Sequence, residues 1–166
     1  MNEPLSFDWE PVSVLLDEGL AAIVEAHWRE VGVHKDEVPL DVDWAGYQLD
    51  EDLGLLKLLA ARRSDKLIGY ASYYVRPHRH YKSTLHAGND AIFVLPEERG
   101  AGIALIRAAE TMLAQLAWPT YPYIRILYHA KMALEADRGT YAKVFERLGY
   151  SAFETTHDKV VKARKE

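Results

Sequence analysis

The spacing of apolar residues near the start of the chain predicts a short strand and then a long helix. Leu5 to Val12 has the character of a strand. Pro11 either places this strand at the edge of a sheet or ends it. From Ser13 to Val31 the apolar residues recur at helical spacing, and Gly32 follows as a helix stop. We therefore expect one continuous helix over residues 13–31, with His27 packed on its apolar face.

A second helix and a hairpin follow this first helix. Asp43 is placed to cap a helix that runs through Trp44 and Tyr47 toward Asp52, and the two-helix segment is expected to be mobile or to face a ligand. Two apolar runs, Leu55 to Ala61 and Lys66 to Val75, flank Ser64-Asp65, which is typical of a turn. Gly69 indicates a weak point or bulge in the second of these strands.

The second half of the chain predicts strands and helices in alternation. The segment from Arg76 to Gly88 interrupts the apolar pattern. At most four antiparallel strands are expected before the helix that begins at Ala101. The order of elements favours an α+β fold with helices on both faces of a sheet. The expected elements are a strand Asp90 to Leu95, a helix Ala101 to Ala117, a strand Tyr123 to His129, a helix from Arg138 or Thr140 to Leu148 that ends at Gly149, and closing strands Tyr150 to Phe153 and Asp158 to Ala163.

The turn between Leu95 and Ala101 has the residues of a phosphate-binding site. Pro96 ends the strand, and Gly100 and Gly102 lie at the start of the helix, where backbone N–H groups lack partners and the helix dipole is positive. A P-loop is excluded because Ile103 and Ala104 stand where its lysine and hydroxyl belong. A dinucleotide fingerprint is disfavoured because Leu105 replaces the third glycine and no acidic residue lies between residues 110 and 135.

The loop Arg99-Gly100-Ala101-Gly102-Ile103-Ala104 resembles the Arg/Gln-x-x-Gly-x-Gly/Ala loop of the GNAT N-acetyltransferases, and the preceding run 94–98 is similar to that family's strand exit. The run Val144-Phe-Glu-Arg-Leu-Gly-Tyr150 is similar to the family's Leu-Tyr-x-x-Leu-Gly-Phe motif. The resemblance covers roughly Lys66 to Val161, and the segment 80–90 looks like the phage- and prophage-encoded branch.

The resemblance implies a mixed, mostly antiparallel sheet whose fourth and fifth strands splay apart. In this sequence those strands are Ala91 to Leu95 and Tyr123 to His129, and acetyl-coenzyme A would bind in the gap between them. Backbone N–H groups around Phe93 and Val94 are the donors that the resemblance implies for the thioester oxygen. Arg99 is expected to contact phosphate or brace the loop. The implied coenzyme-binding residues are Ile92, Phe93, Val94, Arg99, Gly100, Ala101, Gly102, Ile103, Ala104 and Lys131.

Length and composition limit the class of protein. A chain of 166 residues with 49% hydrophobic residues fits one domain over residues 1–166. The net charge of −5 argues against a nucleic-acid partner, and the basic run Lys159 to Lys165 is short. Apolar runs stay below the ~18 residues that span a bilayer, and the acidic start does not resemble a secretory signal. We therefore expect a cytoplasmic protein with no membrane contact, as a monomer or homodimer.

Candidate bases lie on or near the splayed strand. Asp90 occupies the position where several members of the family have a glutamate, and it could act through a water or be only a strand-start carboxylate. His80 and Tyr81 could reach the substrate gap, and His78, His80 and His86 cluster in one segment. His78 and His80 could form half a metal site, but the sequence offers no clear third and fourth ligand, so we expect no metal.

The proton donor to the leaving thiolate is less clear. Phe145 stands where the family often has a tyrosine, and phenylalanine cannot donate a proton. Tyr141, one turn earlier on the same helical face, and Tyr128 on the fifth strand are the candidates. For the acceptor, Trp44, Tyr47, Tyr81, His86 and His129 are candidate pocket residues, although core packing explains Trp44 and Tyr47 equally well.

These residues predict transfer of acetyl from acetyl-coenzyme A to a primary amine by direct attack in a ternary complex, because no cysteine can form an acetyl-enzyme. The acceptor is a small molecule or a protein, and the acidic surface is compatible with a cation such as a polyamine, an aminoglycoside or a protein lysine. The alternative is a coenzyme-binding effector that inhibits or redirects a host protein, which Phe145 and the basic tail motivate. A nucleotide-binding module is a weaker third hypothesis.

Overall fold

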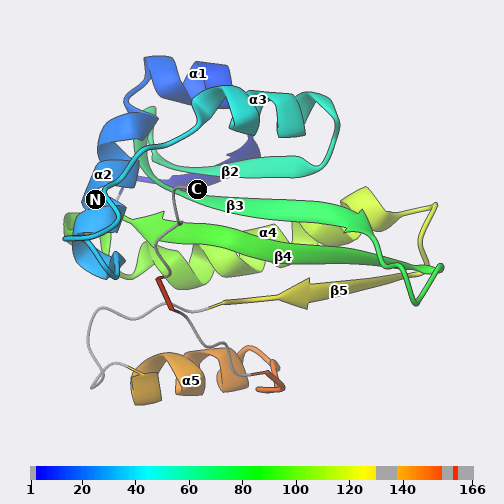
Figure 1. Ribbon diagram of the computed structural model, residues 1–166. Helices are drawn as coiled ribbons and strands as arrows, with labels where there is room; N and C mark the ends of the chain where they lie inside the picture. The colour runs from blue at the N-terminus through cyan, green and yellow to red at the C-terminus, as the bar shows by residue number, and fades with distance from the viewer. Residues whose placement is uncertain (1–2, 130–137, 155–158, 161–166) are drawn as a thin grey trace.

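A five-stranded mixed sheet forms the centre of the fold, with strand order β1-β2-β3-β4-β5 (Figure 1). The computed structural model describes residues 3–129, 138–154 and 159–160, and for residues 138–142 it describes the backbone alone. Strands β1 to β4 pair antiparallel in chain order, and β5 pairs parallel to β4. The strands are β1 Leu5–Trp9, β2 Leu56–Arg63, β3 Lys66–Pro77, β4 Thr84–Val94 and β5 Tyr123–Leu127. The predicted mixed, mostly antiparallel sheet is confirmed.

Helices cover both faces of the sheet. On one face Leu105, Ala109 and Leu113 of α4 pack on residues of β2 and β3 such as Leu59 and Tyr73. On the opposite face α1, α2 and α3 lie over β2 and β3, and their apolar residues pack in a second cluster. The helices are α1 Val12–Asp17, α2 Leu20–Val31, α3 Trp44–Asp52, α4 Ala101–Ala117 and α5 Arg138–Arg147, with a short 3₁₀ turn η1 Pro96–Glu98.

The prediction of one helix over residues 13–31 is wrong, because the segment forms two helices. Gly19 separates them in a left-handed conformation with φ 97°. The carboxylate of Glu18 accepts a hydrogen bond from Arg62 of β2, which also binds Glu10 at 2.6 and 2.7 Å. Apolar periodicity continues through the break, so the sequence pattern does not reveal it.

Strand β4 is longer than the predicted strand Asp90 to Leu95. It begins at Thr84, and residues 84–88 pair with both β3 and β5. Leu85 and Ala87 are buried under α4, whereas His86 and Gly88 point to the other face. The histidine and the glycine within this stretch hid the strand alternation from sequence inspection.

Three further predictions are confirmed. The Asp43 side chain accepts a hydrogen bond from the N–H of Gly46 at 2.9 Å and so caps α3. The β2–β3 pairing shifts register between Ala61 and Arg62, opposite Gly69, which is the predicted bulge. Helix α4 has the predicted bounds.

The C-terminal part differs from the prediction at two places. Strand β5 ends at Leu127 rather than His129, and residues 151–154 form no strand, so the predicted strand Tyr150 to Phe153 is wrong. Tyr150 instead packs its ring against Tyr128 and Phe145. Gly149 ends the last helix with φ 90°, as predicted. The predicted strand Asp158 to Ala163 falls largely outside the described residues.

Candidate active site

The turn from β4 into α4 exposes the backbone N–H groups of the first helical turn. Gly100 precedes α4 with φ 111°, a conformation that favours glycine, and none of the side chains that the structure describes caps the helix. A Cβ built on Gly102 would meet only Cγ2 of Val94, at 3.9 Å, so the space beside this turn is open. Uncapped N–H groups at the positive end of a helix dipole suit a phosphate.

Arg99 braces this turn against helix α2. Its Nη2 lies 2.5 Å from Oε1 of Glu30, and the Arg99 side chain is 57% exposed. Of the two roles expected for Arg99, the structure shows loop bracing, and contact with a phosphate stays a prediction. Sequence reasoning did not identify Glu30, because no pattern links a helix residue to a loop 69 positions away.

Strands β4 and β5 separate beyond Gly88. Their parallel pairing ends at the pair Gly88 and Leu127. At this point the buried side chain of Asn89 accepts a hydrogen bond at 2.5 Å from the N–H of His129, which ties the end of β5 to β4. The expected divergence of the two strands therefore begins at Asn89.

Within the described residues, no strand pairs with this edge of β4 beyond Gly88. The N–H of Leu95 donates to the carbonyl of Ile68 on β3 at 2.9 Å. Because N–H groups alternate between the two edges of a strand, those of Val94 and Ile92 point away from β3 and toward the open edge. Of the two residues implied as oxyanion donors, Val94 has this orientation, whereas the N–H of Phe93 points to β3.

Asp90 lies at a bulge in β4 and is held by side chains from two other elements. The β3–β4 register moves from Ser72–Ala91 to Tyr73–Asn89, which leaves Asp90 without a partner. Its Oδ2 accepts hydrogen bonds from the Tyr47 hydroxyl at 2.5 Å and from the Ser72 hydroxyl at 3.3 Å. The Ser72 oxygen also accepts from the N–H of Ala91 at 3.1 Å, so this buried serine fixes the bulge.

One cavity of about 600 Å³ connects the glycine turn with Asp90. Gly100, Gly102 and Ile103 line the coenzyme end, and Ile92, Phe93 and Val94 line the middle. Asp90, Trp44, Tyr47 and His129 line the other end. Val33, Leu40 and Val42, from the segment between α2 and α3, also line the cavity. This segment was expected to be mobile or to face a ligand, and it forms part of the cavity wall.

A histidine and a tyrosine that contact each other, His27 and Tyr70, also form part of the cavity wall. His27 was expected to be a packed core histidine, but it lines the cavity, stacks on Phe93 at 4.8 Å and lies 2.9 Å from the Tyr70 hydroxyl through Nδ1. Burial raises the pKa of Tyr70, and the charge of Asp90 adds to this effect. The only sequence signal for the contact between His27 and Tyr70 was the presence of a polar residue, His27, on an apolar helix face.

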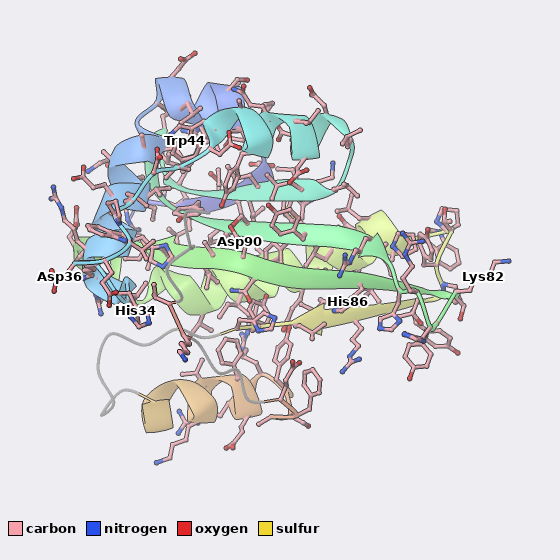
Figure 2. The ribbon with its side chains drawn as sticks, in the orientation of Figure 1. His34, Asp36, Trp44, Lys82, His86 and Asp90 are labelled. Atoms are coloured by element: carbon pink, nitrogen blue, oxygen red, sulfur yellow. The ribbon has the colours of Figure 1, made fainter. Side chains whose placement is uncertain are left out.

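Burial raises the pKa of Tyr47 far above its usual value, and the hydrogen bond to Asp90 acts in the same direction. Tyr47 is therefore protonated throughout the physiological range and donates to the carboxylate. Trp44 lies beside it, with ring centroids 5.7 Å apart. Figure 2 shows Asp90 at the middle of β4 and Trp44 above it, on helix α3.

The histidine cluster lies at the other end of β4, around the hairpin between β3 and β4 (Figure 2). His78 contacts His80, Tyr81 and His86 with ring centroids 5.9, 4.7 and 5.3 Å apart. His80, Tyr81 and His86 do not line the cavity, contrary to the expectation that they reach the substrate gap. Burial lowers the pKa of His86, and the neighbouring charges of His78 and Arg125 lower it further.

The proton-donor candidates lie near the middle of the cavity. The Tyr128 hydroxyl is 2.9 Å from that of Tyr73, and the Tyr128 ring contacts Phe145 at 5.0 Å. Burial raises the pKa of Tyr128. Both Tyr128 and Phe145 line the cavity. Tyr141 belongs to α5, but its side chain lies outside the described residues, as does all of Lys131.

Two further expectations concern the loop residues and metal. Ala101 is buried against the core, and neither Ala101 nor Ala104 contributes to the cavity wall through its side chain. Among the residues that the structure describes, no group of three or more His, Cys, Asp or Glu side chains could hold a metal ion. In the same part of the chain, no helix is long and apolar enough to cross a membrane.

The site fits acetyl-coenzyme A on three structural grounds. The uncapped first turn of α4 suits its pyrophosphate, and the absence of a Cβ at Gly102 leaves room for it. The open edge of β4 offers N–H groups to the amides of the pantetheine arm, as a neighbouring strand would. The cavity then continues to Asp90, where an acceptor can meet the acyl end.

Comparison with known proteins agrees with this geometry. The family model described as the acetyltransferase (GNAT) family matches residues 20–150. The chain belongs to the GNAT acetyltransferase family. No curated protein sequence matches it significantly.

Solved structures share the fold at low identity. A ribosomal-protein-alanine N-acetyltransferase from Brucella melitensis is 16% identical with a TM-score of 0.64, over 96% of this chain and 100% of that one. A predicted acetyltransferase from Clostridium acetobutylicum, solved with acetyl-coenzyme A, is 15% identical with a TM-score of 0.64, over 95% of this chain and 96% of that one. An aminoglycoside acetyltransferase from an uncultured soil metagenomic sample, solved with sisomicin, is 15% identical with a TM-score of 0.62, over 97% of both chains.

Proposed function

We propose that this protein transfers the acetyl group of acetyl-coenzyme A to a primary amine by direct attack in a ternary complex. The observation that carries the proposal is the single cavity that connects an uncapped helix start with the hydrogen-bonded carboxylate of Asp90. Acetyl-coenzyme A supplies the acetyl group as a thioester. The reaction further requires an oriented amine, donors for the carbonyl oxygen and two proton transfers.

The coenzyme end binds and orients the donor. N–H groups of Gly102 and Ile103 in the first turn of α4 bind phosphate oxygens, with Arg99 beside them. The N–H of Val94, at the open edge of β4, donates to the carbonyl oxygen of the acetyl group. A backbone donor fixed in a strand requires little reorganisation when negative charge develops on that oxygen.

Asp90 receives the proton from the acceptor nitrogen, directly or through a water. Tyr47 and Ser72 both bond to Oδ2, which leaves Oδ1 for the acceptor. These bonds hold the carboxylate in a fixed orientation, which is what a general base needs. Tyr47 and Ser72 act through Asp90 and are positioning residues.

The departing sulfur takes a proton from a tyrosine. Tyr128 is protonated and lies on the cavity wall. Its hydroxyl is hydrogen-bonded to the hydroxyl of Tyr73 and also to Tyr150. Tyr141, one turn before Phe145 on α5, is the second candidate. Phe145 packs against Tyr128 and Tyr150, so apolar packing explains the residue that first motivated a binding-only effector.

Initial-rate kinetics and mass spectrometry test this proposal. With acetyl-coenzyme A and a panel of primary amines, we expect release of coenzyme A that depends on both substrates and gives intersecting double-reciprocal lines. The protein incubated with acetyl-coenzyme A alone should keep its unmodified mass. Tight coenzyme binding without turnover on any amine would contradict the proposal, and an acetylated protein intermediate would contradict direct attack.

A further inference from the structure

A cationic surface lies on the same face of β4 as Asp90, at the end of the sheet formed by the β3–β4 hairpin and β5. Arg76, His86 and Arg125 lie side by side on three neighbouring strands, because Arg76 pairs with His86 and His86 pairs with Arg125. The chain contains more acidic than basic residues, 25 against 20, yet segments 76–89 and 118–129 contain no Asp or Glu. Positive charge from Arg76 and Arg125 therefore lies at this end of an acidic protein, with His86, whose pKa is lowered, as a neutral hydrogen-bonding group between them.

The row formed by these three residues faces away from α4. Residues Leu85 and Ala87 pack against α4, so His86 points to the opposite face. Within the described residues, neither Arg76 nor Arg125 forms an ion pair with a carboxylate. The Arg125 guanidinium lies over the ring of Phe153, 4.6 Å from its centroid, which leaves its N–H edge available to a ligand.

Gly88 leaves an open path along β4 between this row and Asp90. A Cβ built on Gly88 would have no atom within 4 Å, so the space above it is empty of described residues. Tyr74, the partner of Gly88 on β3, is 39% exposed and borders the path. Figure 2 shows His86 on β4 between Asp90 and the hairpin end at Lys82.

Asp90 lies four positions along β4 from His86, which corresponds to about 13 Å. We propose that the acceptor is an acidic peptide-like amine, whose amino group meets Asp90 and whose distal carboxylate or phosphate binds the row Arg76, His86 and Arg125. The inference rests on the proposed function, since it assigns the amine to Asp90.

Charge and length both support this acceptor. Guanidinium groups bind carboxylate and phosphate in bidentate geometry, whereas a polyamine or an aminoglycoside would place further positive charge beside two arginines. An extended peptide advances about 3.3 Å per residue, so a free amino terminus at Asp90 places the side chain of its fifth residue near the row. The cationic acceptors considered from net charge alone are therefore disfavoured.

Peptide binding in the presence of coenzyme A tests this inference without any transfer. The probes are pentapeptides with a free amino terminus that differ only at position five, with Glu, phosphoserine, Gln or Lys. We expect calorimetry to show that the Glu or the phosphoserine peptide binds at least tenfold more tightly than the Gln peptide, with the Lys peptide weakest. The tighter of the two anionic peptides identifies the preferred anion.

Three variants locate the binding surface. The double variant Arg76→Ala/Arg125→Ala should abolish the preference for an anion, whereas Arg107→Ala, which removes an exposed arginine from α4, should retain it. Gly88→Val fills the path without a clash and suits a strand, so it should fold normally and weaken binding of the anionic peptides. Equal binding of all four peptides, or a preference that persists in the double variant, would overturn the inference.

The outcome is separable from that of the proposed function. If an acidic peptide binds at the row but is not acetylated when acetyl-coenzyme A is supplied, the transfer proposal fails and the anion site stands. If peptides are acetylated at rates independent of their charge at position five, the transfer proposal stands and this inference fails.

Discussion

Backbone groups form one end of the cavity, and side chains form the other. At the coenzyme end, backbone N–H groups and the absence of a side chain at Gly102 form the surface, within one continuous segment from β4 into α4. At the acceptor end, side chains from three separate elements meet, namely Asp90 on β4, Ser72 on β3 and Tyr47 on α3. The first end therefore depends on backbone conformation, whereas the second depends on the identity of individual side chains.

This difference predicts that the two ends can be disabled separately. In Asp90→Asn the acceptor end loses its proposed base, and we expect kcat to fall about 100- to 1,000-fold. The dissociation constant for coenzyme A, measured by calorimetry, should stay within about twofold of wild type. Asp65→Asn, in the turn between β2 and β3, is the matched control and should leave both quantities unchanged. A large loss of coenzyme affinity in Asp90→Asn would show that the ends are not independent.

Alkaline pH should weaken the fold at the acceptor end and along the β3 face. Burial raises the pKa of Tyr47, Tyr70 and Tyr73 above the usual value of about 10. Above pH 10 the folded state therefore binds more protons than the unfolded state, and the free energy of unfolding falls as pH rises. Urea titrations between pH 8 and pH 11, with phenolate absorbance at 295 nm, measure this. Full ionisation of all tyrosines near pH 10 in the folded protein would contradict it.

Tyr47→Phe removes one hydrogen bond to Asp90 while keeping the ring. We expect kcat/KM for the acceptor to fall about tenfold, because the carboxylate loses a donor that fixes its orientation. The pH dependence of kcat/KM should also change, which loss of packing alone would not cause. Tyr123→Phe, at an exposed position on β5, is the control with the same chemical change. Unchanged kinetics and pH profile would remove Tyr47 from the mechanism.

The smallest expected effect concerns the brace at the coenzyme end. Glu30→Gln breaks the ion pair with Arg99 and removes a negative charge near the phosphates, so coenzyme A should bind about twofold to fivefold more tightly at low salt. Glu25→Gln on the same helix, where Glu25 pairs with Arg29, is the control. Weaker binding in Glu30→Gln would show that bracing matters more than the freed guanidinium.

The same contrast explains what could be predicted from the sequence. The turn at Gly100 and Gly102 and the bounds of α4 depend on local conformational preferences, so the sequence predicted them. The bonds of Asp90 depend on a bulge and on strand register, which bring Ser72 and Tyr47 together across 18 and 43 residues. No local pattern encodes such contacts, so Ser72 was missed.

The histidines also show that local sequence patterns do not reveal contacts between distant segments. His27, which looked like a core residue, lines the cavity because α2 crosses the end of β4 where Phe93 lies. His80, which looked like a site residue, lies at the hairpin because β4 begins at Thr84 and extends the distance to Asp90. Both predictions were wrong for the same reason, because the apolar pattern did not reveal the position of the element that carries the side chain.

Calorimetry with acetyl-coenzyme A on wild type and Gly102→Glu is the most direct test of the central claim, that the first turn of α4 binds the donor. The glutamate places bulk and negative charge beside the N–H groups that we propose bind phosphate, so we expect at least a 100-fold loss of affinity. Gly102→Ala, whose Cβ meets only Val94 at 3.9 Å, controls for folding and should bind within about tenfold of wild type. Equal affinity in wild type and Gly102→Glu would contradict the assignment of the site.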